Sequence, residues 1–224
     1  MKQGLLTVHF MILLIFRVFI ALNLAAQDQP DFEVKLIGKA FINKYPGTNM
    51  QFYKSWMPGE LQMSNGAVAK NRTLVYNCLL DEVIWMRETD HQQVVLRKQT
   101  IAGFTLYHSS NKKIDEFRKV ILPNDSGNVS GGTFLQVLAE GNLSLFVQRK
   151  VILLNSGNEF QTIDQYYLLK NGEYLKLVPN RWSLYRLMGE DRLKMKSIVH
   201  KNFLFIRKEP ALIKAVRLFN QENI

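Results

Sequence analysis

The middle of the chain alternates apolar and polar residues with a period close to two, and no other sequence feature restricts the fold as strongly. In residues 142–150, for example, Leu143, Leu145 and Val147 fall on one face of an extended chain, with polar residues between them. Successive side chains of a strand point to opposite faces of a sheet. The pattern therefore predicts strands with one buried and one exposed face, as in antiparallel sheets.

Turn-forming residues divide these alternating segments at short intervals. Asn171-Gly172 lies between two apolar runs, and this dipeptide favours a tight hairpin because both residues tolerate a positive φ. Further turn signals occur at Asn65-Gly66 and at residues 109–111, 140–142 and 155–158. The spacing predicts an antiparallel meander of about eight or nine strands, closed as a barrel or folded as a sandwich.

After Pro179 the pattern changes to the period of a helix. Ser183 is expected to cap a first helix over residues 184–188, and Gly189 to interrupt it. Glu190 would open a second segment that runs to about residue 201, and Glu209-Pro210 a third. The predicted fold class is mainly β, an antiparallel meander followed by two or three short C-terminal α-helices.

The last predicted helix is amphipathic. Its apolar residues lie at helical spacing, with Lys214 and Arg217 opposite them. The stripe consists of Leu212, Ile213, Val216 and Phe219. It could cover an open end or edge of the sheet, or it could form a surface for a partner. We expect it to cover the sheet, because apolar stripes on terminal helices usually pack into a core.

Residues 1–26 have the order of a secretory signal peptide: Lys2, then apolar runs, then small residues before a polar start near Gln27. Arg17 interrupts the apolar segment, which a start at Met11 would repair. An uncleaved anchor is the alternative, but neither apolar run approaches the roughly 20 residues that a span needs. We expect cleavage, a periplasmic or extracellular location, and no transmembrane span in the mature chain.

These observations divide the chain into three parts. Residues 1–26 are the leader, residues 27–179 a β-rich domain, and residues 180–224 a basic helical tail packed on that domain or appended to it. Cys78 is the only cysteine, so the fold has no internal disulfide. No cationic residue adjoins Cys78 in the sequence, and we expect a small buried hydrophobe rather than a nucleophile.

Positive charge is concentrated in the tail. The formal net charge is +10, and the mature chain would carry +8. Residues 27–179 hold 17 Lys and Arg against 15 Asp and Glu, a net of +2, whereas residues 180–224 hold 10 against 4, a net of +6. The candidate anion-binding residues are Arg186, Arg192, Lys194, Lys196, Lys201, Arg207, Lys208, Lys214 and Arg217. They predict an anionic envelope surface or polymer as partner, and export argues against nucleic acid.

Motifs with fixed catalytic, nucleotide-binding or metal-binding spacing are absent from the sequence. His91, His108 and His200 are far apart, and no catalytic residue, metal or cofactor is predicted. The acids Asp81-Glu82 and Asp115-Glu116 are neighbours, which on a strand would point to opposite faces. A hydrolase would therefore need the fold to bring two acids together in one cleft, from the set Asp81, Glu82, Asp115, Glu140 and Asp164.

Aromatic residues are densest at residues 52–59. Tyr53 and Trp56 are candidate ligand-stacking residues if they are exposed. In small β-rich domains aromatic side chains are usually core, and we expect this of both residues. Trp85 and Trp182 are expected in the core as well.

Several short segments resemble those of uncharacterised exported β-rich proteins of Bacteroidetes-type bacteria. They include Leu24-Ala25-Ala26-Gln27, Pro58-Gly59-Glu60-Leu61, Asn65-Gly66, Leu74-Val75-Tyr76-Asn77 and the tail after Tyr174-Leu175-Lys176-Leu177. The resemblance implies an envelope or secreted protein with a basic helical C-terminal tail, and it implies no catalytic residue. We therefore expect an exported, non-enzymatic structural or binding protein of the cell envelope or extracellular space. The alternative is a hydrolase that acts on envelope polymers.

Overall fold

The computed structural model describes residues 34–45, 48–107, 113–123, 131–154 and 159–222. Contacts divide the chain into two compact units, Met1–Lys35 and Leu36–Ile224. The predicted leader, the turn signals at residues 109–111 and 155–158, and His108 lie outside the described residues. Everything below concerns the second unit.

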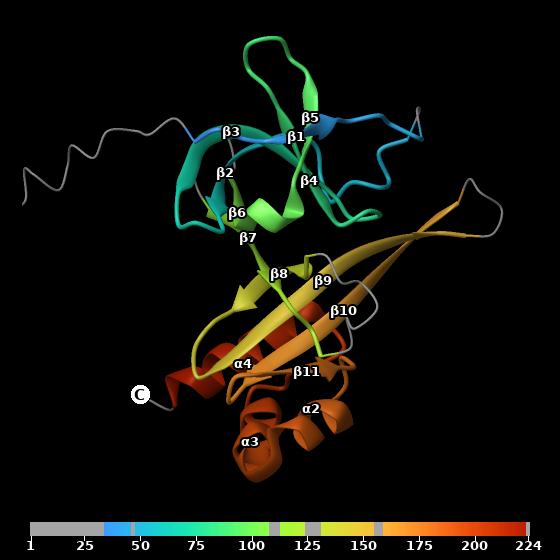
Figure 1. The fold of residues 1–224 in the computed structure, drawn as a ribbon. Coiled ribbons are helices and arrows are strands. Elements are labelled where there is room, and N and C mark those ends of the chain that lie inside the picture. Colours follow the sequence, from blue (N-terminus) through green and yellow to red (C-terminus); the bar gives the residue numbers. More distant parts are fainter. Residues whose placement is uncertain (1–33, 46–47, 108–112, 124–130, 155–158, 223–224) are drawn as a thin grey trace, which may run out of the picture. The chain divides into compact units, whose positions relative to one another are not determined.

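Eleven strands of the described residues form one antiparallel sheet (Figure 1). The strands are β1 (Gly38–Ala40), β2 (Met57–Met63), β3 (Val68–Asn77), β4 (Glu82–Met86), β5 (Gln93–Leu96), β6 (Ile101–Tyr107), β7 (Lys113–Val120), β8 (Thr133–Ala139), β9 (Leu143–Leu153), β10 (Phe160–Lys170) and β11 (Glu173–Leu177), with a short 3-10 turn η1 (Lys98–Thr100) before β6. The predicted antiparallel β fold is confirmed. The predicted strand number was too low, because strands as short as β1 and β5 show little alternation.

The pairing order is β1-β5-β4-β3-β2-β6-β7-β8-β9-β10-β11. From β6 to β11 each strand pairs with the next one in the chain, as in a meander. Strand β2 pairs with both β3 and β6, so the first strands extend the sheet in the other direction. Within the described part of the chain the sheet is open, with β1 and β11 as its edge strands.

The sheet curls around an aromatic core. Phe104 of β6 and Phe117 of β7 stack with ring centroids 4.5 Å apart. Tyr76 of β3 lies 6.2 Å from Phe134 of β8, although β2, β6 and β7 separate these two strands in the pairing order. The buried rings therefore draw distant strands of the sheet together, because large aromatic side chains bury the most apolar area.

The hairpin predicted at Asn171-Gly172 is confirmed. Both residues have a positive φ, 53° and 81°, and Lys170 pairs with Glu173 across the turn. This turn joins β10 to β11 in the register that the two-residue loop requires.

The tail is helical, as predicted. A joined segment contains α2 (Arg181–Met188), the 3-10 turn η2 (Gly189–Asp191) and α3 (Arg192–Lys201), and α4 spans Glu209–Gln221. The predicted cap is wrong: Asn180 caps α2, and its side-chain oxygen accepts from the Ser183 amide at 2.8 Å. Ser183 instead accepts a hydrogen bond from the Val178 amide. Both residue types favour caps, and the helix begins one turn earlier than the apolar pattern indicates.

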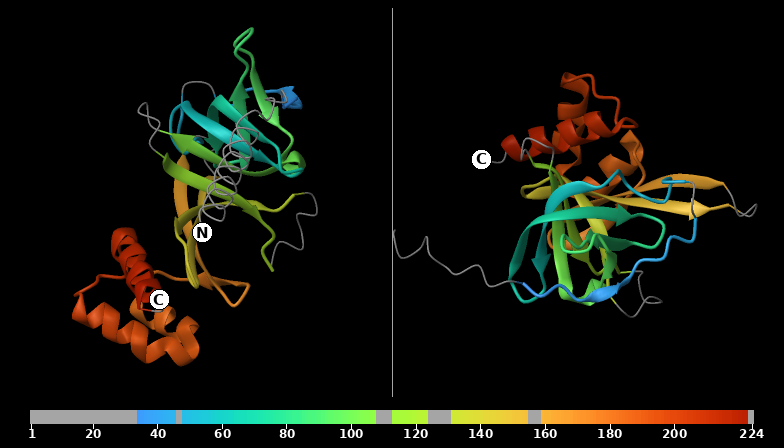
Figure 2. Two further views of the ribbon diagram at one scale, coloured as in Figure 1. Left: turned by 90° about the vertical axis from the view of Figure 1, so that its left-hand side faces the viewer. Right: turned by 90° about the horizontal axis from the view of Figure 1, so that it is seen from above.

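The apolar stripe of α4 covers the sheet, as expected. Leu212, Val216 and Phe219 are buried in a core that they share with residues of β9 and β10, and α4 packs against β8 and β9. Lys214 and Arg217 are exposed. Figure 2 shows the helices gathered beside the last strands of the sheet. The tail is thus part of the packed structure, with its cationic side toward water.

Candidate functional site

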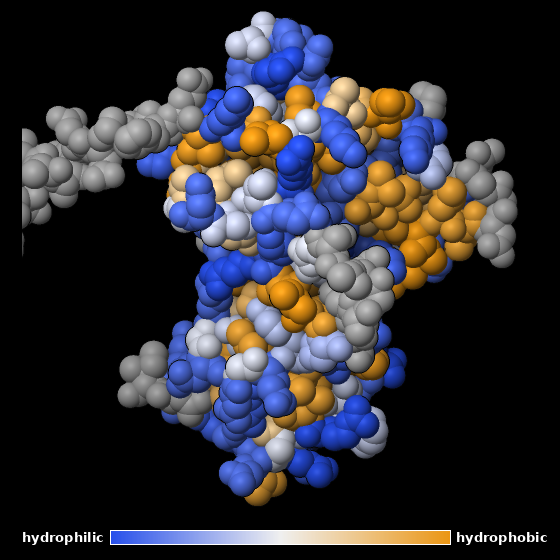
Figure 3. All heavy atoms as spheres, in the orientation of Figure 1, coloured by the Kyte–Doolittle hydropathy of each residue, from blue (hydrophilic) through white to orange (hydrophobic). Residues whose placement is uncertain are grey.

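The helical tail displays large apolar side chains to solvent. Trp182 is 68% exposed, Leu193 77%, Phe203 84% and Phe205 74%. The prediction that Trp182 belongs to the core is therefore wrong, because it follows the cap of α2 and lies outside the face that packs on the sheet. Figure 3 shows the surface over α2 and α3 as largely hydrophilic, with apolar residues among the hydrophilic ones.

Two of these aromatic residues belong to the connection between α3 and α4. In Phe203-Leu204-Phe205-Ile206 the second and fourth side chains are buried, whereas the first and third face solvent. The Arg181 guanidinium donates a 3.3 Å hydrogen bond to the Leu204 carbonyl oxygen. This bond joins the first turn of α2 to the connection. We call the exposed aromatic residues of the two joined segments, Trp182, Phe203 and Phe205, the aromatic tip.

The backbone at Phe203 is unusual. Its φ is 50°, in the left-handed region that a bulky residue rarely adopts. The residue ends α3: its amide donates to the His200 carbonyl at 3.1 Å, and the next amide, of Leu204, donates to Val199 at 3.0 Å. Glycine is the usual residue at such a helix end. An exposed phenylalanine thus occupies a left-handed backbone position, at which glycine would cost less conformational free energy.

Most of the predicted anion-binding residues of the tail are exposed. Exposed side chains are Arg186, Arg192, Lys196, Lys201, Arg207, Lys208, Lys214 and Arg217. Lys194 is the exception, since it is half-buried with its ammonium 4.9 Å from the Phe219 ring centroid. Arg186 lies over the Trp182 ring at 4.5 Å. The sequence prediction omitted Arg181, whose role depends on a contact with the distant Leu204.

The acid that directly follows Arg207 and Lys208 in the sequence, Glu209, points inward. Glu209 is the only Asp or Glu between residues 192 and 221. Its carboxylate accepts from Arg149 Nη2 at 2.9 Å and from the Tyr166 hydroxyl at 2.9 Å. Burial and the hydrogen bond to Glu209 raise the pKa of Tyr166, which keeps this hydroxyl a donor. Glu209 therefore binds the sheet, and the basic residues 192–208 that precede it contain no Asp or Glu.

Arg149 is the centre of a polar network under α4. Besides Glu209, its guanidinium donates to Gln136 at 2.8 Å and to Asp164 at 2.7 Å. Burial opposes the charge of Arg149, but the bond to Glu209 and the charge of Asp164 outweigh burial and raise its pKa. Gln136 in turn donates to Asp115. The network joins β7, β8, β9, β10 and α4 through side chains.

Tyr53 borders this network and lines a cavity of about 230 Å³. The ring is half-buried, edge-on to Phe117 at 5.3 Å, with the Arg149 guanidinium 6.0 Å from its centroid. Trp56 and Trp85 are half-buried too. Tyr53 thus has protein partners on its ring, and the stacking role of Tyr53 and Trp56 stays a prediction.

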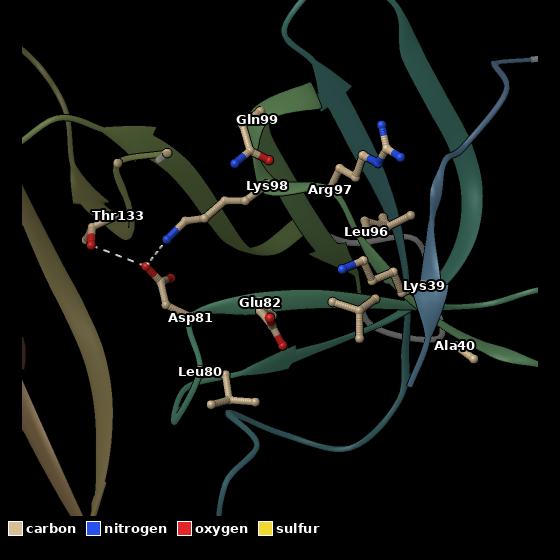
Figure 4. Close-up of a pocket in the computed structure, with 13 residues that line it drawn as sticks. Lys39, Ala40, Leu80, Asp81, Glu82, Leu96, Arg97, Lys98, Gln99 and Thr133 are labelled. Atoms are coloured by element: carbon tan, nitrogen blue, oxygen red, sulfur yellow. Dashed lines mark hydrogen bonds and ion pairs between the residues drawn. The ribbon is translucent and has the colours of Figure 1, made fainter. Parts of the chain in front are cut away.

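A larger pocket of about 510 Å³ lies beside the turn between β3 and β4. Asp81 and Glu82 both line it, contrary to the expectation that neighbouring acids point apart. The reason is the backbone: Asp81 belongs to the turn and has a φ of 55°, so strand alternation does not apply. Figure 4 shows Lys98 and Thr133 reaching toward the Asp81 carboxylate.

The Asp81 carboxylate is well supplied with donors. Lys98 Nζ donates at 2.5 Å and the Tyr76 hydroxyl at 2.7 Å, and the Thr133 hydroxyl and the Phe134 amide complete the set. A carboxylate that holds four donors is fixed in place. Glu82 differs, because burial, with a smaller contribution from the charge of Asp81, raises its pKa. The two acids of the pocket thus have different environments.

The remaining candidate acids are dispersed. Asp115 is buried and pairs with Lys54 at 2.9 Å, whereas its neighbour Glu116 pairs with Arg118, so this pair does point apart. Glu140 pairs with the same Arg118 at 2.6 Å. Among the predicted acids, Asp81 and Glu82 alone line the same described pocket.

Cys78 is buried, as expected. Burial, followed by the negative charge of Asp81, raises the pKa of its thiol to about 12. His91 and His200 are exposed. In the described part of the chain, no three His, Cys, Asp or Glu side chains gather as metal ligands would.

Within the described ranges, no helix has both the length and the apolar character needed to cross a bilayer. Comparison of the chain with protein-family models, curated proteins and solved structures found no match. The helical tail and the Asp81 pocket are therefore the features of the molecule that bear on function.

Proposed function

We propose that this chain is an exported, non-enzymatic binding protein of the cell envelope or extracellular space, which attaches to an anionic surface or polymer through its helical tail. One observation carries the proposal: the helices of the tail and their connection expose eight of the predicted anion-binding Lys and Arg side chains, while the carboxylate of Glu209 is bound inward by Arg149. The sheet is open but curled, and the approach of Tyr76 to Phe134 across it supports a partly open barrel rather than a sandwich. It would serve as the scaffold that holds the helices.

The exposed lysines of the tail would contribute to binding a partner rather than to the stability of the fold. Lys196, Lys201 and Lys208 are exposed, and solvated charges contribute little to stability. A concentrated positive surface instead attracts polyanions and weakens as salt screens it. Such a surface would bind an anionic lipid or an acidic polysaccharide without a pocket.

Binding to an acidic polysaccharide and to anionic vesicles tests this proposal. We expect both to bind at about 0.1 M salt and to dissociate toward about 1 M, where the Debye length falls to roughly 3 Å. A triple variant with Lys196, Lys201 and Lys208 changed to Gln should bind weakly while its melting temperature stays unchanged.

A matched variant controls for net charge alone. Lys44, Lys70 and Lys150 are also exposed but belong to the sheet region, and changing all three to Gln removes the same charge. This variant should bind like the wild type. Equal weakening of both variants would reject the tail as the binding surface, and salt-insensitive binding would reject an electrostatic origin.

Export is proposed from the leader pattern of residues 1–26 and the polar start near Gln27. Mass spectrometry of the protein recovered from cells should find a mature N-terminus near Gln27. Stable recovery of the full-length chain in the membrane fraction would support the uncleaved anchor instead.

A hydrolase is the second candidate, because Asp81 and Glu82 line one pocket and burial raises the pKa of Glu82. A raised carboxyl pKa suits a general acid. We favour binding over catalysis, because the Asp81 carboxylate already accepts hydrogen bonds from Lys98 and three further donors. Turnover of glycosides, esters, phosphoesters or peptides that is lost in Glu82→Gln and kept in Glu173→Gln would establish the hydrolase.

A further inference from the structure

We propose that the partner of the tail is an anionic lipid bilayer, and that the aromatic tip of Trp182, Phe203 and Phe205 inserts into its interfacial region. The inference rests on the proposed function, because the surrounding cations supply the first attraction to the membrane. It adds the class of partner and the side chains that enter it.

The two phenylalanines of the aromatic tip lack an explanation within the fold. The connection contributes Leu204 and Ile206 to the core. Phe203 and Phe205 therefore add exposed apolar area without adding to the packing of that core. Exposed apolar side chains that gather on one surface usually mark an interaction site, and the hydrogen bond from Arg181 to the Leu204 carbonyl holds the segments of Trp182 and of the two phenylalanines together. The left-handed backbone at Phe203 strengthens this view, since strained residues persist where surrounding structure and function hold them.

The composition of the surface favours lipid over other polyanions. Leu193, exposed on α3, has no ring that could stack on a base or a sugar, but it gains from contact with acyl chains. Trp and Phe are typical of helices that lie in the membrane interface, where cations on the same surface contact anionic head groups. Lys201 precedes Phe203 and Arg207 follows Phe205 in the chain. These cations would stay at the head groups and limit the depth of insertion.

A second copy of the chain is a poor occupant of the same surface. The tail carries a net charge of +6, and two tails facing each other through their aromatic tips would bring like charges together. Like charges across an interface oppose association. An anionic bilayer complements both the charge and the apolar side chains.

The test uses the full mature protein and vesicles of phosphatidylcholine alone or mixed with phosphatidylglycerol. Tryptophan emission should shift to shorter wavelength only on the mixed vesicles, and brominated acyl chains should quench it. Trp56 and Trp85 also emit, so Trp182→Phe identifies the signal: that variant should lose most of the shift. A Phe203→Ser, Phe205→Ser double variant should bind mixed vesicles about tenfold more weakly, since it loses most of the apolar contact.

The outcomes separate this inference from the proposed function. If the double variant binds mixed vesicles as tightly as the wild type and no shift occurs, insertion is wrong while charge-driven attachment stands. If the wild type binds neither vesicles nor acidic polysaccharide, the proposed function fails, and the inference fails with it. Tight binding of polysaccharide or nucleic acid that depends on the same two phenylalanines, without vesicle binding, would overturn lipid as the partner. Thermal unfolding of the double variant should match the wild type, because both side chains are exposed.

Discussion

Arg149 on β9 and Glu209 at the start of α4 are 60 residues apart in sequence and form an ion pair of 2.9 Å under the helix. The pair has two effects. It fastens the tail to the sheet, and it removes the acid that would otherwise lie next to Lys208 in the basic region. The attachment of the helices and the charge of their outer surface therefore depend on the same carboxylate.

Loss of Arg149 should destabilise the fold. Arg149→Met leaves the carboxylates of Asp164 and Glu209 partly buried without their cation, and we expect a loss of about 3 kcal/mol in the free energy of unfolding. Chemical denaturation measures it. Arg87→Met is the matched control, since Arg87 forms an ion pair with Asp90 at the surface. It should leave stability nearly unchanged, and similar losses in both variants would show that the network has no special role.

Glycine at position 203 should stabilise the protein and weaken its membrane binding. Phe203→Gly relieves the left-handed backbone, whose cost for a side-chain-bearing residue is about 1 to 2 kcal/mol, partly offset by the entropy that glycine loses on folding. We expect a net gain of roughly 0.5 to 1 kcal/mol in thermal or chemical unfolding. Phe205 lacks the positive φ, and Phe205→Gly should give no gain. A destabilised Phe203→Gly variant would mean that the phenylalanine packs on the fold.

The pocket acid Glu82 should make stability depend on pH. Burial raises its pKa in the folded state, so the folded state holds the proton more readily than the unfolded state. The associated stability is present at low pH and is lost as pH rises through the folded pKa. Glu82→Gln should therefore melt at a higher temperature than the wild type at about pH 7 and equally at about pH 4. The exposed Glu173→Gln should show no such difference, and a Glu82→Gln variant less stable at about pH 7 would contradict the account.

The thiol of Cys78 should react slowly. Its pKa of about 12 keeps it protonated near neutral pH, and the side chain is buried. A maleimide reagent should label the native protein far more slowly than the denaturant-unfolded protein, as followed by mass spectrometry. Labelling of the native protein at the rate of a free thiol would show an accessible, reactive cysteine.

Features that depend on neighbouring residues were predictable from the sequence. The Asn171-Gly172 hairpin follows from two residues that tolerate a positive φ, and the packing of α4 follows from the spacing of Leu212, Val216 and Phe219. Alternation also predicted the antiparallel sheet. It missed short strands such as β1, whose three residues contain no readable period.

Features that depend on distant contacts or on single backbone angles were not predictable. Asp81 shares a pocket with Glu82 because its φ is positive, which strand alternation does not anticipate. Trp182 was assigned to the core by its size, but the face of α2 that meets the sheet is decided by tertiary packing. The exposure of Phe203 and Phe205 arises from an alternation of only four residues, which a search for helical periods passes over.

Sedimentation of the wild-type protein with vesicles of increasing phosphatidylglycerol content tests the central claim most directly. At about 0.1 M salt the bound fraction should rise steeply with anionic lipid, remain near zero on pure phosphatidylcholine, and fall when salt is raised to about 1 M. Equal binding to neutral and anionic vesicles, or no binding at any lipid composition, would contradict a tail that attaches the protein to anionic membranes.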